Sequence, residues 1–169
     1  MLRDDFVDYS ARKLGQYLER IEVCLGRLND DQIWSRGHES ENSIGNLCLH
    51  LAGNVRQWIL CGIGGEEDHR QRDAEFAAAG GHDRDELLGD LRATVEQACV
   101  LIRTLTSERL EERVTIQNYP VTVLEGVYHV VEHFSHHAGQ ILFATKAMLG
   151  EHLGFYRHLS QDEHDETTP

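Results

Sequence analysis

The chain has 169 residues, 27% of them charged, and a formal net charge of -13. This length predicts one domain with a sizeable core, and the composition is typical of a globular protein. The strong negative charge argues against a nucleic acid or an anionic membrane as partner, because little is available to neutralise phosphates. We expect one domain over residues 1–158 and an acidic, solvated and mobile tail over residues 159–169.

Apolar residues recur at helical spacing in the first part of the chain. The first predicted helix covers residues 2–28 and ends in a polar turn at 29–31. The second covers residues 44–60, begins after capping residues at 40–43 and is closed by a group of glycines. A long connection, residues 64–82, follows it. Asp83 is then expected to cap a third helix that reaches residue 105.

The fourth predicted helix follows a short β-branched segment. Residues 113–120 predict a small extended or hairpin element. Thr122 and Glu125 form a capping-box pattern at the start of a helix over residues 123–149, which Gly150 ends. Four long helices with a long middle connection predict an all-α four-helix bundle.

The cysteines and the N-terminus indicate the compartment. The first five residues include charges, which is not the pattern of a secretory signal. No apolar run approaches the roughly 20 residues that a membrane span needs. No two cysteines stand at CxxC spacing, so we expect a cytoplasmic protein with reduced, buried thiols. These cysteines are Cys24, Cys48, Cys61 and Cys99.

The second helix has an unusual polar face. Arg56 is its only charged residue between positions 44 and 61, and the polar face consists of Asn46, His50, Asn54 and Gln57. A solvated helix face normally carries lysine and glutamate. A neutral polar face therefore predicts a cavity or a subunit interface.

Histidines dominate one stripe of the fourth helix. The four histidines between positions 129 and 137 fall within an arc of roughly 100° on a helix. They are His129, His133, His136 and His137. Two histidines at i and i+4 can reach one metal ion, and His50 on the neutral face is the natural third ligand. Three imidazoles with one open position are typical of a catalytic rather than a structural site.

Simpler interpretations of this stripe remain open. It could be a pH-titrating surface or a dimer seam. His129 and His136 could be hydrogen-bonded residues that do not bind metal. Glu132 could act as a base or hold a ligand histidine, although a solvated helix charge is the simpler interpretation. Three further histidines near or in the tail receive no role: His152, His158 and His164.

Two segments resemble the signatures of the DinB-like (DinB/YfiT) superfamily of metal-binding four-helix bundles. The first is residues 42–58, NSIGNLCLHLAGNVRQW, and the second is residues 129–141, HVVEHFSHHAGQI. Residues 70–76, RQRDAEF, and 153–157, LGFYR, resemble marks of one uncharacterised branch. The resemblance covers nearly the whole chain before the tail.

The resemblance implies an up-up-down-down bundle that is usually a homodimer. It also implies one divalent metal per chain, nickel or zinc, held by His50, His133 and His137. His129 and His136 then become neighbours of the ligands, although His136 could exchange roles with His137. Relatives of known activity imply the transfer or isomerisation of substrates with a small thiol of the bacillithiol, mycothiol or glutathione type.

The same resemblance suggests which residues surround a substrate. Asn46, Asn54 and Gln57 would line the pocket, and an arginine could hold a substrate carboxylate; the candidates are Arg56, Arg70 and Arg72. Two other functions fit the pattern. One is a metal-dependent hydrolase that activates water with Glu132 or another carboxylate as base. The other is a non-catalytic metal-binding stress-response protein. No second cluster of carboxylates is evident, which counts against the hydrolase.

Overall fold

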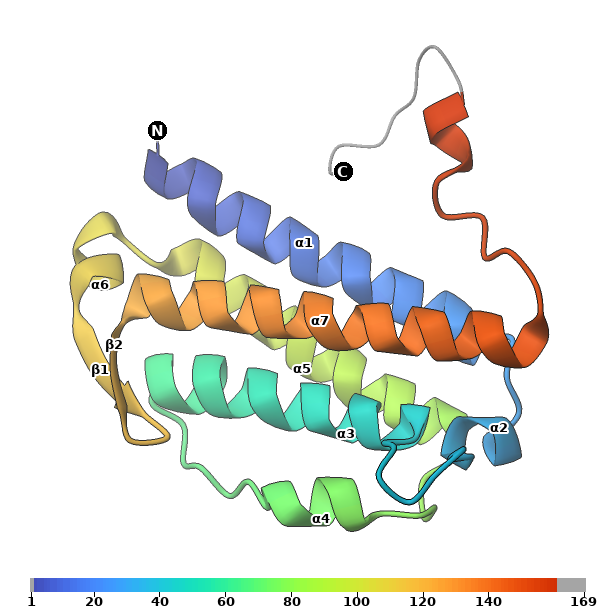
Figure 1. Cartoon of the computed structure of the whole chain (residues 1–169). Helices are drawn as coiled ribbons and strands as arrows, with labels where there is room; N and C mark the ends of the chain where they lie inside the picture. Colours follow the sequence, from blue (N-terminus) through green and yellow to red (C-terminus); the bar gives the residue numbers. More distant parts are fainter. Residues whose placement is uncertain (1, 161–169) are drawn as a thin grey trace.

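The computed structural model describes residues 2–160 and contains four long helices packed side by side (Figure 1). They are α1 (Leu2–Leu25), α3 (Ile44–Val55), α5 (Arg84–Thr104) and α7 (Val123–Leu149). Helices α1 and α3 each pack against both α5 and α7, so they occupy opposite corners of the bundle. The prediction of an all-α four-helix bundle is confirmed.

The directions of the helices differ from the expected order. The sequence colours in Figure 1 show that α1 and α7 run one way along the bundle, whereas α3 and α5 run the other way. The order is up-down-down-up, so the expectation of up-up-down-down is wrong. Because α3 and α5 are parallel, the chain must return along the whole bundle between them, and the long connection at residues 64–82 makes that crossing.

Short helices occupy the connections. They are α2 (Asp30–Trp34), α4 (Arg72–Ala77) and α6 (Ser107–Glu111), and the 3₁₀ turn η2 (Arg157–Ser160) follows α7. Asn29 and Gln32 form a capping box at the start of α2, so the expected polar turn begins a new helix instead. As a result α1 ends at Leu25, three residues earlier than predicted.

The predicted caps and the hairpin form as expected. Thr122 and Glu125 make the capping box of α7, and Gly150 ends that helix with a φ of 66°. Strands β1 (Arg113–Ile116) and β2 (Tyr119–Thr122) pair antiparallel. Gln117 and Asn118 both have positive φ, as a tight two-residue hairpin turn requires.

The second long helix changes geometry after α3. It continues as η1 (Arg56–Ile63), a π-helical segment that reaches beyond the predicted end near residue 60. A π-helix is rare and is found most often near functional sites. Gly62 lies where the hairpin crosses this segment, and a Cβ there would come within 2.5 Å of the Ile116 side chain. Glycine therefore permits the close approach of the hairpin.

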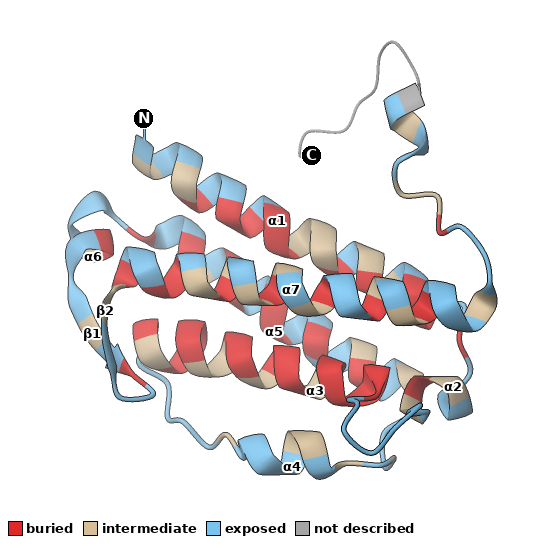
Figure 2. Ribbon diagram, in the orientation of Figure 1, coloured by how far each residue is buried: buried red, intermediate tan, exposed pale blue. Residues whose placement is uncertain are grey.

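The core lies between the four long helices. Figure 2 shows α3 almost entirely buried, whereas α4 and the hairpin are largely exposed. All four cysteines are buried free thiols. None of the helices within residues 2–160 has the length and apolarity that crossing a membrane requires. Of the acidic tail predicted over residues 159–169, the first two residues belong to the 3₁₀ turn η2, and residues 161–169, with His164, lie outside the described residues.

Candidate metal centre

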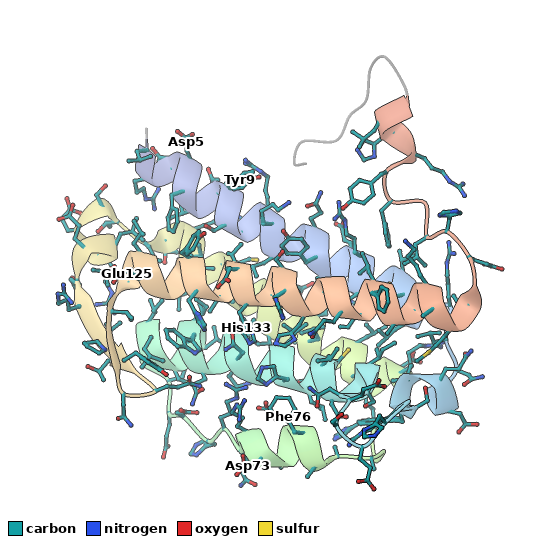
Figure 3. All side chains as sticks on the ribbon, in the orientation of Figure 1. Asp5, Tyr9, Asp73, Phe76, Glu125 and His133 are labelled. Carbon is teal, nitrogen blue, oxygen red and sulfur yellow. The ribbon has the colours of Figure 1, made fainter. Side chains whose placement is uncertain are left out.

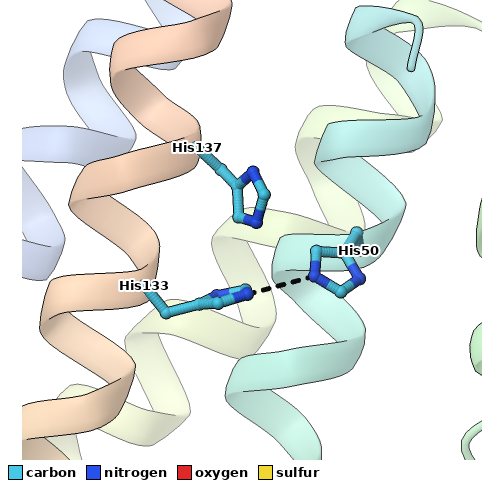
Figure 4. Close-up of side chains that lie close together, drawn as sticks. All are labelled: His50, His133 and His137. Carbon is cyan, nitrogen blue, oxygen red and sulfur yellow. Dashed lines mark hydrogen bonds between the residues drawn. The ribbon is translucent and has the colours of Figure 1, made fainter. Parts of the chain in front are cut away.

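Three histidines from two helices face one another between α3 and α7 (Figure 4). His50 comes from α3, and His133 and His137 stand one turn apart on α7. Each offers one ring nitrogen, and these nitrogens all lie within 4.8 Å of one another. The Nε2 atoms of His50 and His133 are 3.1 Å apart.

The spacing of these nitrogens fits a common metal ion. Two nitrogens that each lie about 2.0–2.1 Å from an ion at the tetrahedral angle are about 3.3 Å from each other. The 3.1 Å between the Nε2 atoms of His50 and His133 is close to that value. Imidazole suits zinc, nickel, copper and iron, so the three-histidine group could hold a divalent metal ion.

Burial favours the neutral form of the two α7 histidines in this group. Burial, together with the nearby rings of His137 and His50, lowers the pKa of His133 to about 3. Burial also lowers the pKa of His137, while a hydrogen bond to Gln140 acts in the opposite direction. Neutral imidazoles have the free lone pair that a metal requires.

Two of the three histidines have a partner on the ring nitrogen that points away from the group. Nδ1 of His50 lies 3.0 Å from Oε2 of Glu75, and Nδ1 of His137 lies 2.7 Å from Oε1 of Gln140. When Nδ1–H donates to such an oxygen, Nε2 is left unprotonated and available to a metal. Nδ1 of His133 is buried without a hydrogen-bond partner among residues 2–160.

Glu75 belongs to a buried ion pair. Nε of Arg70 donates to its Oε1 at 2.7 Å, and Nη2 donates to its Oε2 at 2.8 Å. The Arg70 and Glu75 side chains are only 5% and 11% exposed. Burial acts to raise the pKa of Glu75, but the hydrogen bonds from Arg70 and His50 outweigh it, so the pKa lies below its ordinary value. Glu75 is therefore an ionised carboxylate beside His50.

The sequence pattern does not point to Glu75. Residues 70–76 resemble only a mark of one family branch, and Arg70 is a candidate for binding a substrate carboxylate. The Arg70 guanidinium is instead occupied by the Glu75 carboxylate. The available signal was an arginine and a glutamate five positions apart in an otherwise unassigned connection, which does not indicate the contact with His50, 25 residues away.

The other histidines of α7 lie around the group rather than in it. The half-buried His129 ring is 4.2 Å from the Trp58 ring and 5.6 Å from the His133 ring. His136 is exposed, with its ring 5.3 Å from that of His137. The geometry therefore brings His137, and not His136, together with His50. Glu132 is an exposed residue of α7.

The neutral polar face of α3 is covered by the connection between η1 and α5, residues 64–82, which we call the crossover segment. Asn46 is fully buried, and its Nδ2 donates to the carbonyl oxygens of Glu75 and Ala78, both at 2.8 Å. Asn46 therefore lines neither a cavity nor a subunit interface, contrary to the prediction. Gln57 donates to Asp68 at 2.7 Å, so it too contacts this segment.

Two further arginines also have intramolecular partners. Nη2 of Arg56 donates to Oγ1 of Thr94 at 2.7 Å and approaches Asp90 at 3.3 Å. The guanidinium of Arg72 lies 4.8 Å from the centre of the Phe76 ring. Arg56 thus links η1 to α5, whereas the contact between Arg72 and Phe76 lies within α4.

Comparisons with known proteins agree with this fold. The family model "Protein of unknown function (DUF1572)" matches residues 2–160. A conserved protein from Enterococcus faecalis is 17% identical, with a TM-score of 0.70 over 85% of this chain and 96% of that one. The DinB-like protein YjoA from Bacillus subtilis is 16% identical, with a TM-score of 0.66 over 88% and 97%.

A DinB-like protein from Bacillus cereus is 17% identical, with a TM-score of 0.61 over 81% of this chain and 88% of that one. At these identities the solved structures establish the fold alone. No curated protein matches the chain. Because the family model spans all the described residues, the chain belongs to the DUF1572 family, and its fold is similar to that of DinB-like proteins.

Proposed function

We propose that His50, His133 and His137 bind one divalent metal ion, zinc or nickel, and that the protein is a metal-dependent transferase for a small thiol. The observation that carries the proposal is the group of three imidazoles, from two helices, within 4.8 Å of one another. The low pKa of His133 and the outer partners of the other two rings support it.

Three protein ligands leave a further position for a substrate. A metal in such a site supplies Lewis-acid chemistry, which lowers the pKa of a bound thiol and provides a nucleophile at neutral pH. The chain itself holds the imidazoles neutral and orients two of them. Thiols of the bacillithiol, mycothiol or glutathione type fit this chemistry.

Polar atoms beside the histidines support a substrate that carries its own polar groups. Asn54 and Trp58 follow His50 at intervals of four residues, and the Trp58 ring contacts His129. Oδ1 of Asn54 and Nε1 of Trp58 are buried without hydrogen-bond partners among the described residues. An acceptor and a donor of this kind could bind the amide or carboxylate groups of a small thiol.

The positions of the carboxylates favour a transferase over a hydrolase. In the alternative function, a metal-dependent hydrolase, the activation of water needs a carboxylate that is free to act as base. Glu75 is occupied by Arg70 and His50, and Glu132 is an exposed residue of α7. Neither has the position that the hydrolase requires.

Elemental analysis of protein purified without a histidine tag tests the proposal. We expect about one zinc or nickel per chain, lost in His50→Ala, His133→Ala and His137→Ala. His136→Ala is the matched control, because this neighbour is exposed and should leave the metal content unchanged. A wild type that takes up neither zinc nor nickel would contradict the metal site.

A thiol-transfer assay tests the reaction itself. We expect product from a small thiol and an electrophile, and its loss in His50→Ala. Cleavage of an ester or amide without any thiol would favour the hydrolase. Metal binding without either reaction would favour a non-catalytic metal-binding protein. The homodimer implied by the resemblance stays a prediction that sedimentation velocity can test.

A further inference from the structure

We infer that Glu75, held by Arg70, is a positioning residue that fixes the tautomer of His50 and thereby raises the metal affinity of the site. The inference rests on the proposed metal-binding function. On this inference the crossover segment does more than connect the second long helix to α5, because it also carries the carboxylate that orients His50. Figure 3 shows α4 lying along α3 with Phe76 directed toward the bundle.

The Arg70–Glu75 pair is built tightly against the helix that carries His50. A Cβ at Gly53 would overlap Oε1 of Glu75 and come within 2.9 Å of Nε of Arg70. Position 53 therefore accommodates the pair because it lacks a side chain. Gln57 adds a contact one turn later, since its Oε1 accepts from Nη1 of Arg70 at 2.9 Å.

Two more contacts hold Glu75 in place. Its carbonyl oxygen accepts from Asn46 at 2.8 Å, and the ring of the following residue, Phe76, lies 4.6 Å from the His50 ring. The Glu75 carboxylate cannot move away from His50 without breaking its hydrogen bonds to Arg70 or displacing the backbone that Asn46 holds. A buried ion pair gives little net stability compared with apolar residues of similar size. Its position on His50 is therefore better explained by what it does to the imidazole.

The carboxylate selects one tautomer of His50. An ionised Glu75 can only accept, so the ring nitrogen 3.0 Å from its Oε2 carries the proton and Nε2 stays bare. Nη2 of Arg70 also lies 3.1 Å from Nδ1 of His50, which by itself would suit the opposite tautomer. However, Nη2 already donates to Oε2 at 2.8 Å, and an unprotonated Nδ1 would face the lone pairs of that oxygen.

Glu75→Gln should weaken this preference. Oε2 of Glu75 accepts from Nη2 of Arg70 and also faces Nδ1 of His50, while Oε1 accepts from Nε. The amide has a single oxygen, so its nitrogen takes the place of one of these oxygens, and His50 loses its ionised acceptor in either orientation. A neutral amide oxygen holds the Nδ1 proton less strongly than a carboxylate does, and an amide N–H in the place of Oε2 favours a proton on Nε2, which must be lost before a metal can bind. Replacement of such a carboxylate partner typically weakens metal binding about 10- to 100-fold.

The test combines nitrogen-15 NMR of the metal-free protein with zinc affinity measured by competition with a chelator. We expect the His50 proton on Nδ1 in the wild type and a larger share of it on Nε2 in Glu75→Gln, with zinc affinity lowered about 10- to 100-fold. The matched control is Asp73→Asn, an exposed carboxylate on the same short helix whose side chain points away from the bundle (Figure 3). It should change neither readout.

Gly53→Ala provides a second variant that keeps Glu75 itself. Glycine to alanine inside a helix normally stabilises the protein, but here the new methyl group would displace the ion pair. We expect weaker zinc binding and a loss of the Nδ1–H preference without global unfolding, which circular dichroism would check.

Two results would overturn the inference. One is a wild-type His50 with its proton on Nε2, and the other is a Glu75→Gln protein with unchanged tautomer and zinc affinity. Failure of the proposed metal function gives a different result. A wild type that binds no zinc, but whose His50 tautomer depends on Glu75, would contradict the metal site and support the positioning role.

Discussion

Asn46 offers a test of how the crossover is held to the bundle. Its Oδ1 accepts from the backbone and hydroxyl of Ser43 and from Arg36, and its Nδ2 donates to the carbonyls of Glu75 and Ala78. Asn46→Ala removes these bonds together. The lost bond from the Ser43 backbone N–H contributes about 1 kcal/mol. The Glu75 carbonyl left without a donor costs about 1–3 kcal/mol.

The Ala78 carbonyl adds little to this loss, because it still accepts from Nη2 of Arg36 at 2.7 Å. We therefore expect Asn46→Ala to lower the free energy of unfolding by about 2–4 kcal/mol, measured by urea denaturation. Zinc affinity should fall as well, because Glu75 is no longer anchored. Asn42→Ala, an exposed asparagine just before α3, is the control and should change stability little. A loss below about 1 kcal/mol with unchanged zinc affinity would refute this reasoning.

Four further predictions follow from burial and hydrogen bonding. Phe134 is fully buried, so Phe134→Ala should lower the free energy of unfolding by about 3–5 kcal/mol in urea denaturation; a change below about 1 kcal/mol would contradict the packing. The pKa of His133 falls from 6.5 to about 3 on folding, so the unfolded chain binds more protons between these values. The stability of the metal-free protein should therefore decrease as the pH is lowered from about 6.5 toward 3, and His133→Gln should flatten that dependence. Burial raises the pKa of the Cys48 thiol to about 12, so a thiol reagent should label it only after unfolding; rapid labelling of the native protein would argue against this burial. Gln140→Ala removes a neutral, exposed hydrogen-bond partner of His137, so it should weaken zinc binding by less than about tenfold. A larger loss of zinc affinity than in Glu75→Gln would disprove this expectation.

Local chemistry made much of the fold predictable from the sequence. The capping box of Thr122 and Glu125, the end of α7 at Gly150 and the hairpin depend on residues within a few positions of one another. The four long helices follow from the spacing of apolar side chains, and the i, i+4 spacing of His133 and His137 puts both on one face. Such features require no knowledge of distant contacts.

The polar face of α3 shows what local pattern could not decide. Its lack of charge correctly marked a face that is not solvated, but the sequence did not reveal what covers it. The covering element is the crossover of the same chain, with α4 against Asn46 and His50. This follows from the direction of α5, which forces the connection to run along the bundle.

Helical periodicity in the sequence is enough to predict long amphipathic helices, one of which carries a stripe of histidines. The pairing of His50 with His137 rather than His136, and the contact of His50 with Glu75, 25 residues away, become visible only in the folded chain. Helix periodicity fixes the direction in which a side chain points from the axis of its own helix. The packing of separate helices fixes which side chains it meets.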